Sequence, residues 1–376
     1  MNSFVPTTPV YARGNASPTA SMLTPCRNSA ESCSLAPASK EAMAACHRSL
    51  HKFRRGQPQS CRKLFEEGFP IDYNGDLLSP ARDLGLVERQ GVTWATTYRL
   101  TWLRELIVVT DHFTVRDPDR VFPLSEDESL LLARGLVVLP GDSVLDIGTG
   151  SGILALCAAR KARRVVAVDV NPRALAYAQF NSALNGFGDR ISFQQSDVFT
   201  EVDTDDQFDL VVSNPPVIPA PEGSGFFLHS DGGPEGVQVS ETILRGVADH
   251  LSSDGRLQML CTSWSRAENE LTLLKSMPDG LARCWNCRVQ ELYPEPLSPI
   301  QLLLEHFSEV SSFDSWHQRI ESSGFERLHY LYLELTSRNG LVSPTEPQEV
   351  CADRWNGSWA RRLERLFLAY RQMDNL

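Results

Sequence analysis

The chain lacks the features that mark membrane and secreted proteins. No stretch of its 376 residues approaches the run of about eighteen apolar residues that a membrane-spanning helix needs. The N-terminus lacks a basic segment followed by an apolar one, so the sequence indicates no secretory signal. Nine cysteines at irregular spacing suggest no disulfide framework. We therefore expect reduced thiols, a cytoplasmic location and no contact with a membrane.

The chain also has too little positive charge for a protein that coats nucleic acid. Its net charge is −11, which excludes that class. Residues 48–63 depart from this balance because they are rich in Arg and Lys. They predict either a solvated basic face or a contact for phosphates or an acidic partner. Cys284 and Cys287 form a lone CxxC with no second pair at a suitable spacing, so we expect no metal site.

Composition and periodicity divide the chain into four parts. Residues 1–45 are rich in Ser, Thr, Ala, Pro and Asn without periodicity, which predicts a disordered tail. Residues 46–118 predict a small α+β cap, with a helix in "LLSPARDLGLVER" and two strands in "GVTWATTYRLTWL" and "ELIVVTD". Residues 119–340 alternate strands and helices, the pattern of a parallel sheet, with a helical insert at 297–323. Residues 341–376 predict a helical extension.

Seven strands are expected in the large domain. They are "DSVLDIG", "RRVVAVDV", "RISFQQSD", "FDLVVSN", "RLQMLCTSW", "CWNCRVQELY" and "HYLYLELTSR". Helices are expected in "SEDESLLLARGLV", "SGILALCAARKA", "NPRALAYAQFNSALNG" and "EGVQVSETILRGVADHLSSDG". Ser125 and Glu128 fit a capping box for the first of them. Asn171 fits an N-cap for the third helix, with Pro172 at its first position and Gly186 after its end.

A glycine-rich turn between the first strand and its helix predicts a ligand site. Asp146, Gly148, Gly150 and Gly152 lie in "VLDIGTGSGILAL", where glycines let backbone N–H groups approach a ligand closely. A nicotinamide dinucleotide is the weaker alternative, because its fingerprint is G-x-G-x-x-G and this turn has G-x-G-x-G. The chain also lacks a phosphate-gripping lysine motif.

Two further acids follow the next two strands. Asp169 comes nineteen residues after Gly150, and Asp197 ends the third strand. In open α/β sheets the carboxyl ends of the strands line the ligand crevice. A carboxylate at Asp169 can accept both hydroxyls of a ribose, and one at Asp197 can accept from an adenine amino group. Either acid alone fits a helix cap equally well, but with the glycines they predict a nucleoside site.

These segments together resemble a known family. "VLDIGTGSGILAL", "VVAVDVN", "SD" and "DLVVSNPP", in this order, resemble class I S-adenosylmethionine-dependent methyltransferases. More narrowly they resemble the NPP-bearing amino-methyltransferases, which include release-factor and ribosomal-protein glutamine methyltransferases and small-domain ribosomal RNA base N-methyltransferases. The resemblance covers roughly residues 120–265. It implies a Rossmann-like seven-stranded α/β sheet, here with a small N-terminal α+β cap, and S-adenosylmethionine as cofactor.

The resemblance also assigns roles to individual residues. It implies that Asp146 and the glycines hold the methionine part, Asp169 the ribose and Asp197 the adenine. The full set expected to bind the cofactor is Asp146, Gly148, Thr149, Gly150, Gly152, Asp169, Val170, Asp197, Val198 and Asn214.

Asn214, Pro215 and Pro216 are the expected catalytic residues. Prolines donate no backbone hydrogen bond, so the fourth strand must end here. Asn-Pro also opens ordinary turns, so the motif alone would not indicate catalysis. Its place at the end of the fourth strand, after the predicted cofactor site, is what favours a catalytic role. The Asn214 side-chain carbonyl and the Pro215 backbone carbonyl can each accept one N–H of an acceptor. They would turn the nitrogen lone pair toward the methyl group, which suits in-line transfer to nitrogen.

The residue after the prolines departs from the family pattern. Relatives usually carry an aromatic ring there, whereas this chain has Val217. Phe226 and Phe227 are candidates to supply the ring, so all three are expected substrate-binding residues. Asp231 and Glu235 either receive a cationic substrate or cap the following helix.

Several acceptors remain open from the sequence. A protein glutamine suits the resemblance to release-factor enzymes, and a small metabolite suits Val217 and the helical insert. A ribosomal or transfer RNA base suits residues 48–63, although the acidic chain as a whole opposes it. A non-catalytic cofactor-binding scaffold is the alternative of another class.

Overall fold

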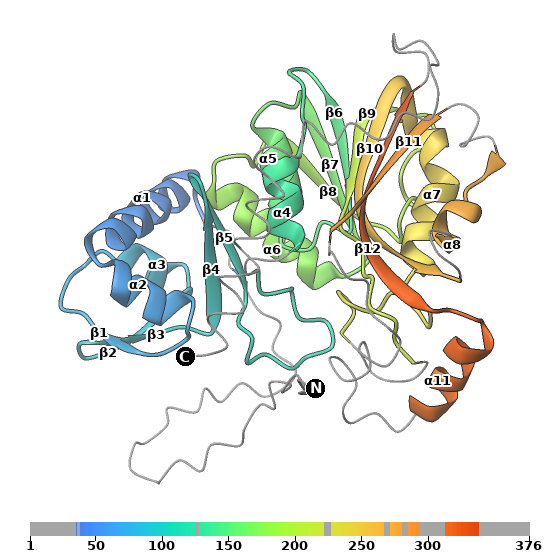
Figure 1. Cartoon of the computed structure of the whole chain (residues 1–376). Helices are drawn as coiled ribbons and strands as arrows, with labels where there is room; N and C mark the ends of the chain where they lie inside the picture. Colours follow the sequence, from blue (N-terminus) through green and yellow to red (C-terminus); the bar gives the residue numbers. More distant parts are fainter. Residues whose placement is uncertain are drawn as a thin grey trace, which may run out of the picture. The chain divides into compact units, whose positions relative to one another are not determined.

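The computed structural model describes residue 35 and residues 38–124, 128–221, 227–266, 271–279, 285–292 and 313–337 (Figure 1). The expectations for most of the tail, the Ser125–Glu128 capping box, Phe226, Cys284, much of the insert and the C-terminal extension lie outside these residues. Among the described residues, no helix combines the length and the apolar character that crossing a membrane requires.

A seven-stranded sheet forms the centre of the described chain. Its strand order is β11-β12-β10-β9-β6-β7-β8, and only β12 runs antiparallel to its neighbours. All seven predicted strands are confirmed. The strands are β6 (Ser143–Ile147), β7 (Arg164–Asp169), β8 (Ile191–Gln195), β9 (Phe208–Ser213), β10 (Leu251–Ser265), β11 (Trp285–Glu291) and β12 (Arg327–Ser337).

The order reverses between β6 and β9, which creates the crevice where doubly wound sheets bind ligands. From β6 the chain moves outward through β7 to β8, then returns to β9 on the other side of β6. Both strands beside this switch point are apolar and buried along nearly their whole length. The carboxyl ends of β6 and β9, where the glycine turn and Asn214 begin, therefore lie next to each other.

Helices cover both faces of the sheet. In Figure 1, α4, α5 and α6 lie on one side of the sheet and α7 and α8 on the other. Their bounds are α4 (Glu128–Gly135), α5 (Ile153–Ala159), α6 (Pro172–Leu184), α7 (Gln238–His250) and α8 (Thr272–Lys275), with α11 (Phe313–Ser322) following β11. At α6 the predicted cap is confirmed, because the Asn171 side chain accepts from the Arg173 N–H at 2.9 Å, with Pro172 at the first position. Gly186 follows the end of that helix at φ +78°.

The N-terminal elements contain more helix than the sequence suggested. They are α1 (Lys40–Gly56), α2 (Pro58–Phe65), β1 (Ile71–Asp72), α3 (Ser79–Asp83), β2 (Glu88–Gln90), β3 (Thr93–Ala95), β4 (Tyr98–Leu103) and β5 (Leu106–Asp111). The basic segment 48–63 is therefore helical, and α1 begins inside the stretch 1–45, where the Ser39 hydroxyl accepts from Ala42 N–H at 3.2 Å.

The prediction of one strand over "GVTWATTYRLTWL" is wrong. The structure breaks it into β3, which pairs with β1 and β2, and β4, which pairs with β5. Thr96 lies at the break. Its hydroxyl donates to the Leu86 carbonyl at 2.6 Å and accepts from Tyr98 N–H at 3.0 Å, which takes the backbone out of the ladder. The predicted helix in "EGVQVSETILRGVADHLSSDG" also ends earlier, because β10 already begins at Leu251.

Asn181 of α6 and Asn185, which caps the end of that helix, hold β5 against α6. The Asn181 side chain accepts from Val109 N–H at 2.8 Å and donates to the Val109 carbonyl at 2.9 Å. Asn185 makes the same pair of bonds with Ile107, at 2.9 and 2.7 Å. These amides satisfy backbone groups that would otherwise form an unpaired strand edge. Asn181 also donates to the Ser151 carbonyl at 2.8 Å, so it links β5 to the glycine turn.

Candidate active site

The glycine turn between β6 and α5 forms an open cradle. Gly148, Gly150 and Gly152 have φ values of +67°, +54° and +84°, a region that side chains other than glycine disfavour. A Cβ added at Gly148 would meet nothing within 4 Å, whereas one at Gly152 would lie 3.2 Å from the Ala178 Cα. Gly152 therefore permits close packing against α6, while Gly148 leaves space above the turn for a ligand.

Asp146 stabilises this turn from below. One carboxylate oxygen accepts from the Thr149 hydroxyl at 2.7 Å and from the Ala155 N–H at 3.0 Å, which orders the first turn of α5. The other oxygen, Oδ1, is buried and has no hydrogen-bond partner among the described residues. Burial raises the pKa of Asp146 to about 7. A buried acceptor without a partner at a ligand cradle fits a group that carries positive charge.

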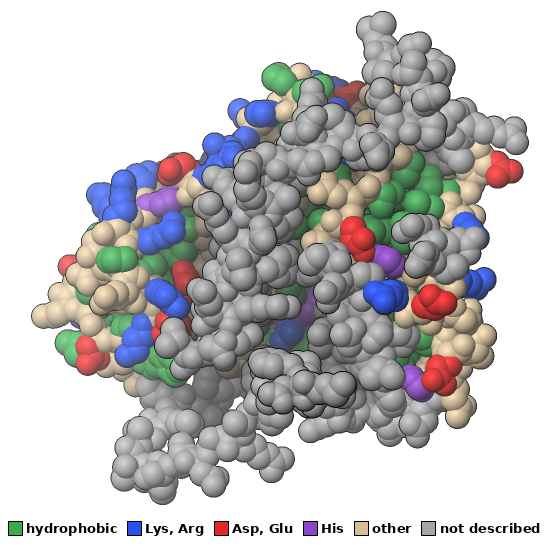
Figure 2. Space-filling model, in the orientation of Figure 1, with side chains coloured by type: hydrophobic (Ala, Val, Ile, Leu, Met, Phe, Trp, Pro, Cys, Tyr) green, Lys and Arg blue, Asp and Glu red, His purple; other side chains and the backbone are tan. Residues whose placement is uncertain are grey.

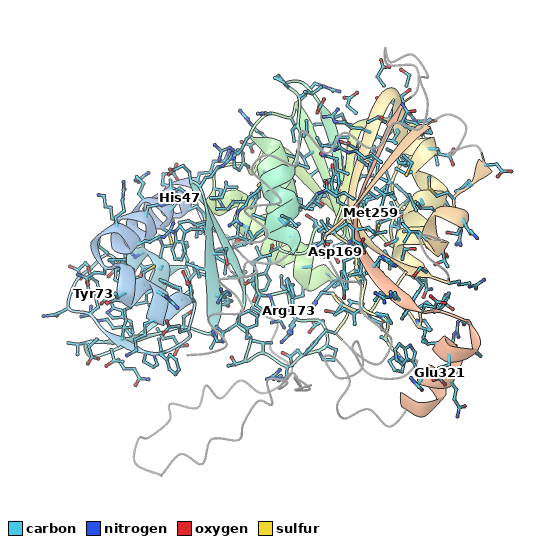
Figure 3. All side chains as sticks on the ribbon, viewed as in Figure 1. His47, Tyr73, Asp169, Arg173, Met259 and Glu321 are labelled. Carbon is cyan, nitrogen blue, oxygen red and sulfur yellow. The ribbon has the colours of Figure 1, made fainter. Side chains whose placement is uncertain are left out.

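Asp169 lies at the carboxyl end of β7, beside the cradle (Figure 3). Its Oδ2 accepts from Gly150 N–H at 2.8 Å and its Oδ1 from Asn171 N–H at 2.9 Å. Burial raises the pKa of Asp169, against the opposing effect of these N–H groups. The carboxylate is thus fixed in position against the turn. Val170, the next residue, is 47% exposed.

The segment after β8 contains a strained valine. Val198 has φ +52°, which is rare for a β-branched residue, and its side chain is buried. Its neighbour Asp197 starts the turn: the Asp197 carbonyl accepts from Thr200 N–H at 3.0 Å, and the Asp197 N–H donates to the Thr200 hydroxyl at 3.2 Å. The pair lies at the same edge of the sheet as Asp169, where the sequence predicted it.

Asn214 follows β9 and its amide is held by α4. The Asn214 Nδ2 donates to the Ser129 hydroxyl at 2.7 Å. This contact commits the amino side of the amide and leaves the carbonyl oxygen as the part that can accept from a substrate. The preceding Ser213 donates to the Ile147 carbonyl at 2.8 Å, so the ends of β9 and β6 are joined next to the glycine turn. Pro215 is buried and Pro216 half-buried.

The chain after the prolines runs beside residues 227–233. Ile218 N–H donates to the Ser230 carbonyl and Gly232 N–H to the Ile218 carbonyl, both at 3.0 Å. These two backbone bonds hold residues 227–233 beside Ile218. Val217, which replaces the aromatic ring of relatives, is the residue before Ile218. Phe227, which the sequence predicted to replace the ring, belongs to the same segment.

The structure adds residues that the sequence did not indicate. The Phe227 ring stacks on His229 with 5.4 Å between centroids and 6° between planes, and the Arg120 guanidinium lies 3.7 Å from the Phe227 centroid. Arg120 Nε also donates to His229 Nε2 at 3.2 Å. We call Arg120, Phe227 and His229 the aromatic stack. Arg120 is more than a hundred positions from the other two members, so no local pattern could have joined it to them.

His229 is neutral in this stack. Burial, and then the charge of Arg120, lower its pKa to about 4. Because Nε2 accepts from Arg120, Nδ1 carries the proton and donates to the Ser230 hydroxyl at 2.7 Å. The stack therefore presents a planar, uncharged imidazole beside an aromatic ring.

The stack is connected to the cofactor side by residues 117–122. Leu228 N–H donates to the Pro118 carbonyl at 2.9 Å, and the Asn171 side chain donates to the Asp119 carbonyl at 2.8 Å. Arg173, shown with Asp169 in Figure 3, lies 3.8 Å from Asp119. Residues 117–122 therefore connect the region of Asp169, at the end of β7, to residues 227–233 beside Val217.

Of the two roles considered for Asp231 and Glu235, the prediction that they cap the following helix is wrong. α7 begins after Val237, and its N-terminus has no side-chain cap. Asp231 instead accepts from Gly233 N–H at 2.9 Å, and Glu235 lies 3.4 Å from the Arg319 guanidinium on α11. Both acids therefore shape the segment before α7. Within the described ranges, no group of three or more His, Cys, Asp or Glu residues could hold a metal ion.

Comparisons with known proteins agree with this geometry. Residues 124–277 match the family model described as methyltransferase small domain. A protein from Methanocaldococcus jannaschii that carries the provisional name protein N5-glutamine methyltransferase is 30% identical over 177 residues, which are 46% of this chain and 87% of that protein.

Two more relatives differ in the acceptor that their names give. The release factor glutamine methyltransferase of Cereibacter sphaeroides is 34% identical over 180 residues, 45% of this chain and 60% of that protein. The tRNA1(Val) (adenine(37)-N6)-methyltransferase of Vibrio campbellii is 25% identical over 213 residues, 56% of this chain and 86% of that protein.

Proposed function

The chain belongs to the methyltransferase small domain family of S-adenosylmethionine-dependent methyltransferases, and from this premise we propose that it methylates the side-chain amide nitrogen of a glutamine in a protein. The observation that carries the proposal is the Asn214 amide, whose amino side is committed to Ser129 at 2.7 Å. Two relatives whose names specify a glutamine acceptor support the choice of acceptor.

The residues of the cradle suit the cofactor. We propose that the backbone of Gly148 and Gly150 contacts its methionine part, that Asp169 accepts from the ribose hydroxyls and that Asp197 lies at the adenine. The buried, unpartnered Oδ1 of Asp146 fits a cofactor that carries positive charge. When bound, the cofactor supplies an activated methyl group on a sulfonium sulfur.

Asn214 and Pro215 would prepare the acceptor nitrogen. The lone pair of a primary amide is delocalised into its carbonyl group, so the nitrogen is a weak nucleophile. The Asn214 Oδ1 and the Pro215 carbonyl oxygen each accept one N–H of the acceptor amide, which aims the lone pair at the methyl carbon. The new N–C bond forms as the C–S bond breaks, the electron pair of that bond stays on sulfur, and one N–H proton leaves to solvent. The prolines keep both carbonyl groups fixed throughout.

The aromatic stack supplies the flat wall that Val217 lacks. We propose that the acceptor amide lies against Phe227 and His229, which the Ile218–Ser230 ladder holds beside the Asn-Pro-Pro segment. Burial and the charge of Arg120 lower the pKa of His229 to about 4, so the imidazole itself adds no charge beside a neutral amide. A glutamine acceptor in a component of translation would also agree with the cytoplasmic location expected from the sequence.

A series of three variants tests the assignment of Asn214. Label from methyl-labelled S-adenosylmethionine is followed into the protein fraction of a host extract. We expect Asn214→Ala to lower turnover by about a hundredfold or more, as for the loss of a fixed polar group that stabilises a transition state. Ser129→Ala should cause a smaller loss, because Asn214 keeps its carbonyl oxygen but loses its support.

A matched variant controls for the mutation itself. Asn286→Ala on β11 removes the same side chain from an exposed position and should leave turnover unchanged. Cofactor affinity should change little in Ser129→Ala and Asn286→Ala. Equal turnover in Asn214→Ala and Asn286→Ala would contradict the assignment.

A further inference from the structure

Exposed cations gather on the first two helices. Figure 2 shows Lys and Arg side chains gathered over α1 and the neighbouring ends of β4 and β5. Six cations of α1 and α2 are exposed, in a chain whose net charge is −11: Arg48, Lys52, Arg54, Arg55, Arg62 and Lys63. Arg48, Lys52 and Arg55 are spaced four and three positions apart, so they share one face of α1.

The positive surface continues onto the large domain. His47 and His51 of α1 donate to the Glu105 carbonyl at 3.0 and 3.2 Å, so the β4–β5 turn, with the exposed Arg104, lies beside α1. The β4–β5 turn leads to Ile107, which exchanges two hydrogen bonds with Asn185 at the end of α6. The end of α5 is tied to the residues after α6, because the Arg190 guanidinium donates to the Ala159 carbonyl at 3.1 Å. The exposed side chains after α5 are again cations: Arg160, Lys161 and Arg163.

An exposed aromatic ring lies next to the cations of α2. Phe69 is 58% exposed, which is unusual for a large apolar side chain. Its N–H donates to the Lys63 carbonyl at 2.9 Å, so the ring follows directly on the helix that carries Arg62 and Lys63. Surfaces that bind single-stranded nucleic acid combine two features. Cations contact the phosphate backbone, and an aromatic ring stacks on a base.

We propose that α1, α2, the β4–β5 turn and residues 160–163 form a surface that binds the phosphate backbone of RNA, with Phe69 stacking on an unpaired base. We call these elements the basic surface. Arginine predominates over lysine in it, and the guanidinium fork matches phosphate oxygens in two-point contacts. The exposed Phe69 favours RNA over an acidic protein, because every unpaired base offers a flat face for stacking.

The basic surface is separate from the candidate active site. Residues 160–163 precede β7, so they lie at the amino ends of the strands, whereas the glycine turn, Asp169 and Asn214 lie at the carboxyl ends. RNA bound there would hold the enzyme at a ribonucleoprotein rather than enter the reaction. This inference goes beyond the proposed function, and a binding measurement tests it without depending on methyl transfer.

The test measures binding of a single-stranded RNA of about 20 nucleotides by fluorescence anisotropy, at about 50 mM and about 200 mM salt. The full chain is compared with the triple variant Arg48→Gln, Lys52→Gln, Arg55→Gln. Each lost phosphate contact should lower the slope of log K against log salt by about 0.7, so the triple variant should lose about 2 units of slope. Its affinity at the lower salt concentration should fall by about tenfold or more.

A second variant and a matched control make the result specific. Phe69→Ala should weaken binding without changing the salt slope, because stacking releases no counterions. The control Arg245→Gln, Arg319→Gln, Arg327→Gln removes the same charge from three exposed positions on α7, α11 and β12, and should bind RNA as the wild type does.

Three outcomes would overturn the proposal. The first is no RNA binding by the wild-type chain at the lower salt concentration. The second is an equal loss in the triple variant and its control, because net charge would then explain the binding. The third is binding of polyglutamate with at least the affinity for RNA, which would assign the surface to an acidic protein.

Discussion

Asp146 is the residue whose ionisation most directly affects the proposed cofactor site. Its carboxyl is buried beneath the glycine turn, one of its oxygens has no partner among the described residues, and its pKa is raised to about 7. The folded pKa lies above the ordinary value of 3.8. In the protein without cofactor, the stabilisation from protonating Asp146 is therefore complete below about pH 4 and is lost as the pH rises toward 7.

Cofactor affinity should show the opposite dependence on pH. The cationic cofactor favours the ionised carboxylate, so its dissociation constant should fall several-fold between about pH 6 and about pH 8. Isothermal titration calorimetry at both pH values measures this change. Asp146→Asn keeps the contacts that accept from Thr149 and Ala155 but cannot ionise, so its affinity should vary much less with pH. A wild-type affinity that is constant over this range would contradict the role given to Asp146.

Asp169 offers a second test of the cofactor site. Asp169→Ala removes the carboxylate that we assign to the ribose hydroxyls, and charge-assisted hydrogen bonds of this kind contribute about 1.5–3 kcal/mol. We expect the dissociation constant for S-adenosylhomocysteine to rise by at least tenfold, which corresponds to about 1.4 kcal/mol. Asp189→Ala is the control, because that carboxylate is exposed and pairs with the exposed Lys40. Equal affinities in the two variants would remove Asp169 from the site.

Among the elements, the contact between β5 and α6 connects the N-terminal part to the sheet. Asp111 at the end of β5 accepts from Arg173 at 2.7 Å, from the Tyr177 hydroxyl at 2.5 Å and from Val121 N–H at 2.7 Å. Its side chain is 3% exposed and that of Arg173 is 22% exposed. One carboxylate therefore joins β5, α6 and the residues that lead to the aromatic stack.

Removing Asp111 should destabilise the fold strongly. Asp111→Ala leaves the Arg173 guanidinium, the Tyr177 hydroxyl and a backbone N–H without their acceptor, and breaking a buried ion pair costs about 3–5 kcal/mol. We expect a fall of about 3 kcal/mol in the free energy of unfolding, because Arg173 keeps some exposure to solvent. Urea unfolding measures the change, with Asp189→Ala as an exposed comparison that should unfold like the wild type. A change below about 1 kcal/mol would show that Asp111 does not join these elements.

The sequence predicts the elements that local patterns determine. The seven strands of the sheet were predictable because most are short apolar runs between turn signals, and the N-cap at Asn171 was predictable from Asn-Pro. The break at Thr96 was not, because it depends on a hydroxyl that bonds to Leu86, ten positions earlier. The aromatic stack could not be predicted for the same reason, because only the folded chain brings Arg120 into contact with Phe227. The roles given to the acids and to Asn214 remain predictions.

For the whole molecule, cofactor binding should be coupled to stability. A ligand that binds only the folded state stabilises it by about 2.7 kcal/mol at a hundredfold excess over its dissociation constant. S-adenosylhomocysteine should therefore raise the midpoint of thermal unfolding of the wild type by several degrees and that of Asp169→Ala by much less. Differential scanning fluorimetry measures both shifts. Equal shifts in the two proteins would show that the ligand binds elsewhere.

The central claim is that Asn214 positions a glutamine of another protein for methyl transfer. One measurement tests it most directly. The purified chain is incubated with methyl-labelled S-adenosylmethionine and a host extract separated into protein, RNA and small-molecule fractions, and labelled products are identified by mass spectrometry. Wild-type protein should place one methyl group on a glutamine side chain in the protein fraction, and Asn214→Ala should not. Label in the RNA or small-molecule fraction, or unchanged labelling by Asn214→Ala, would contradict the account.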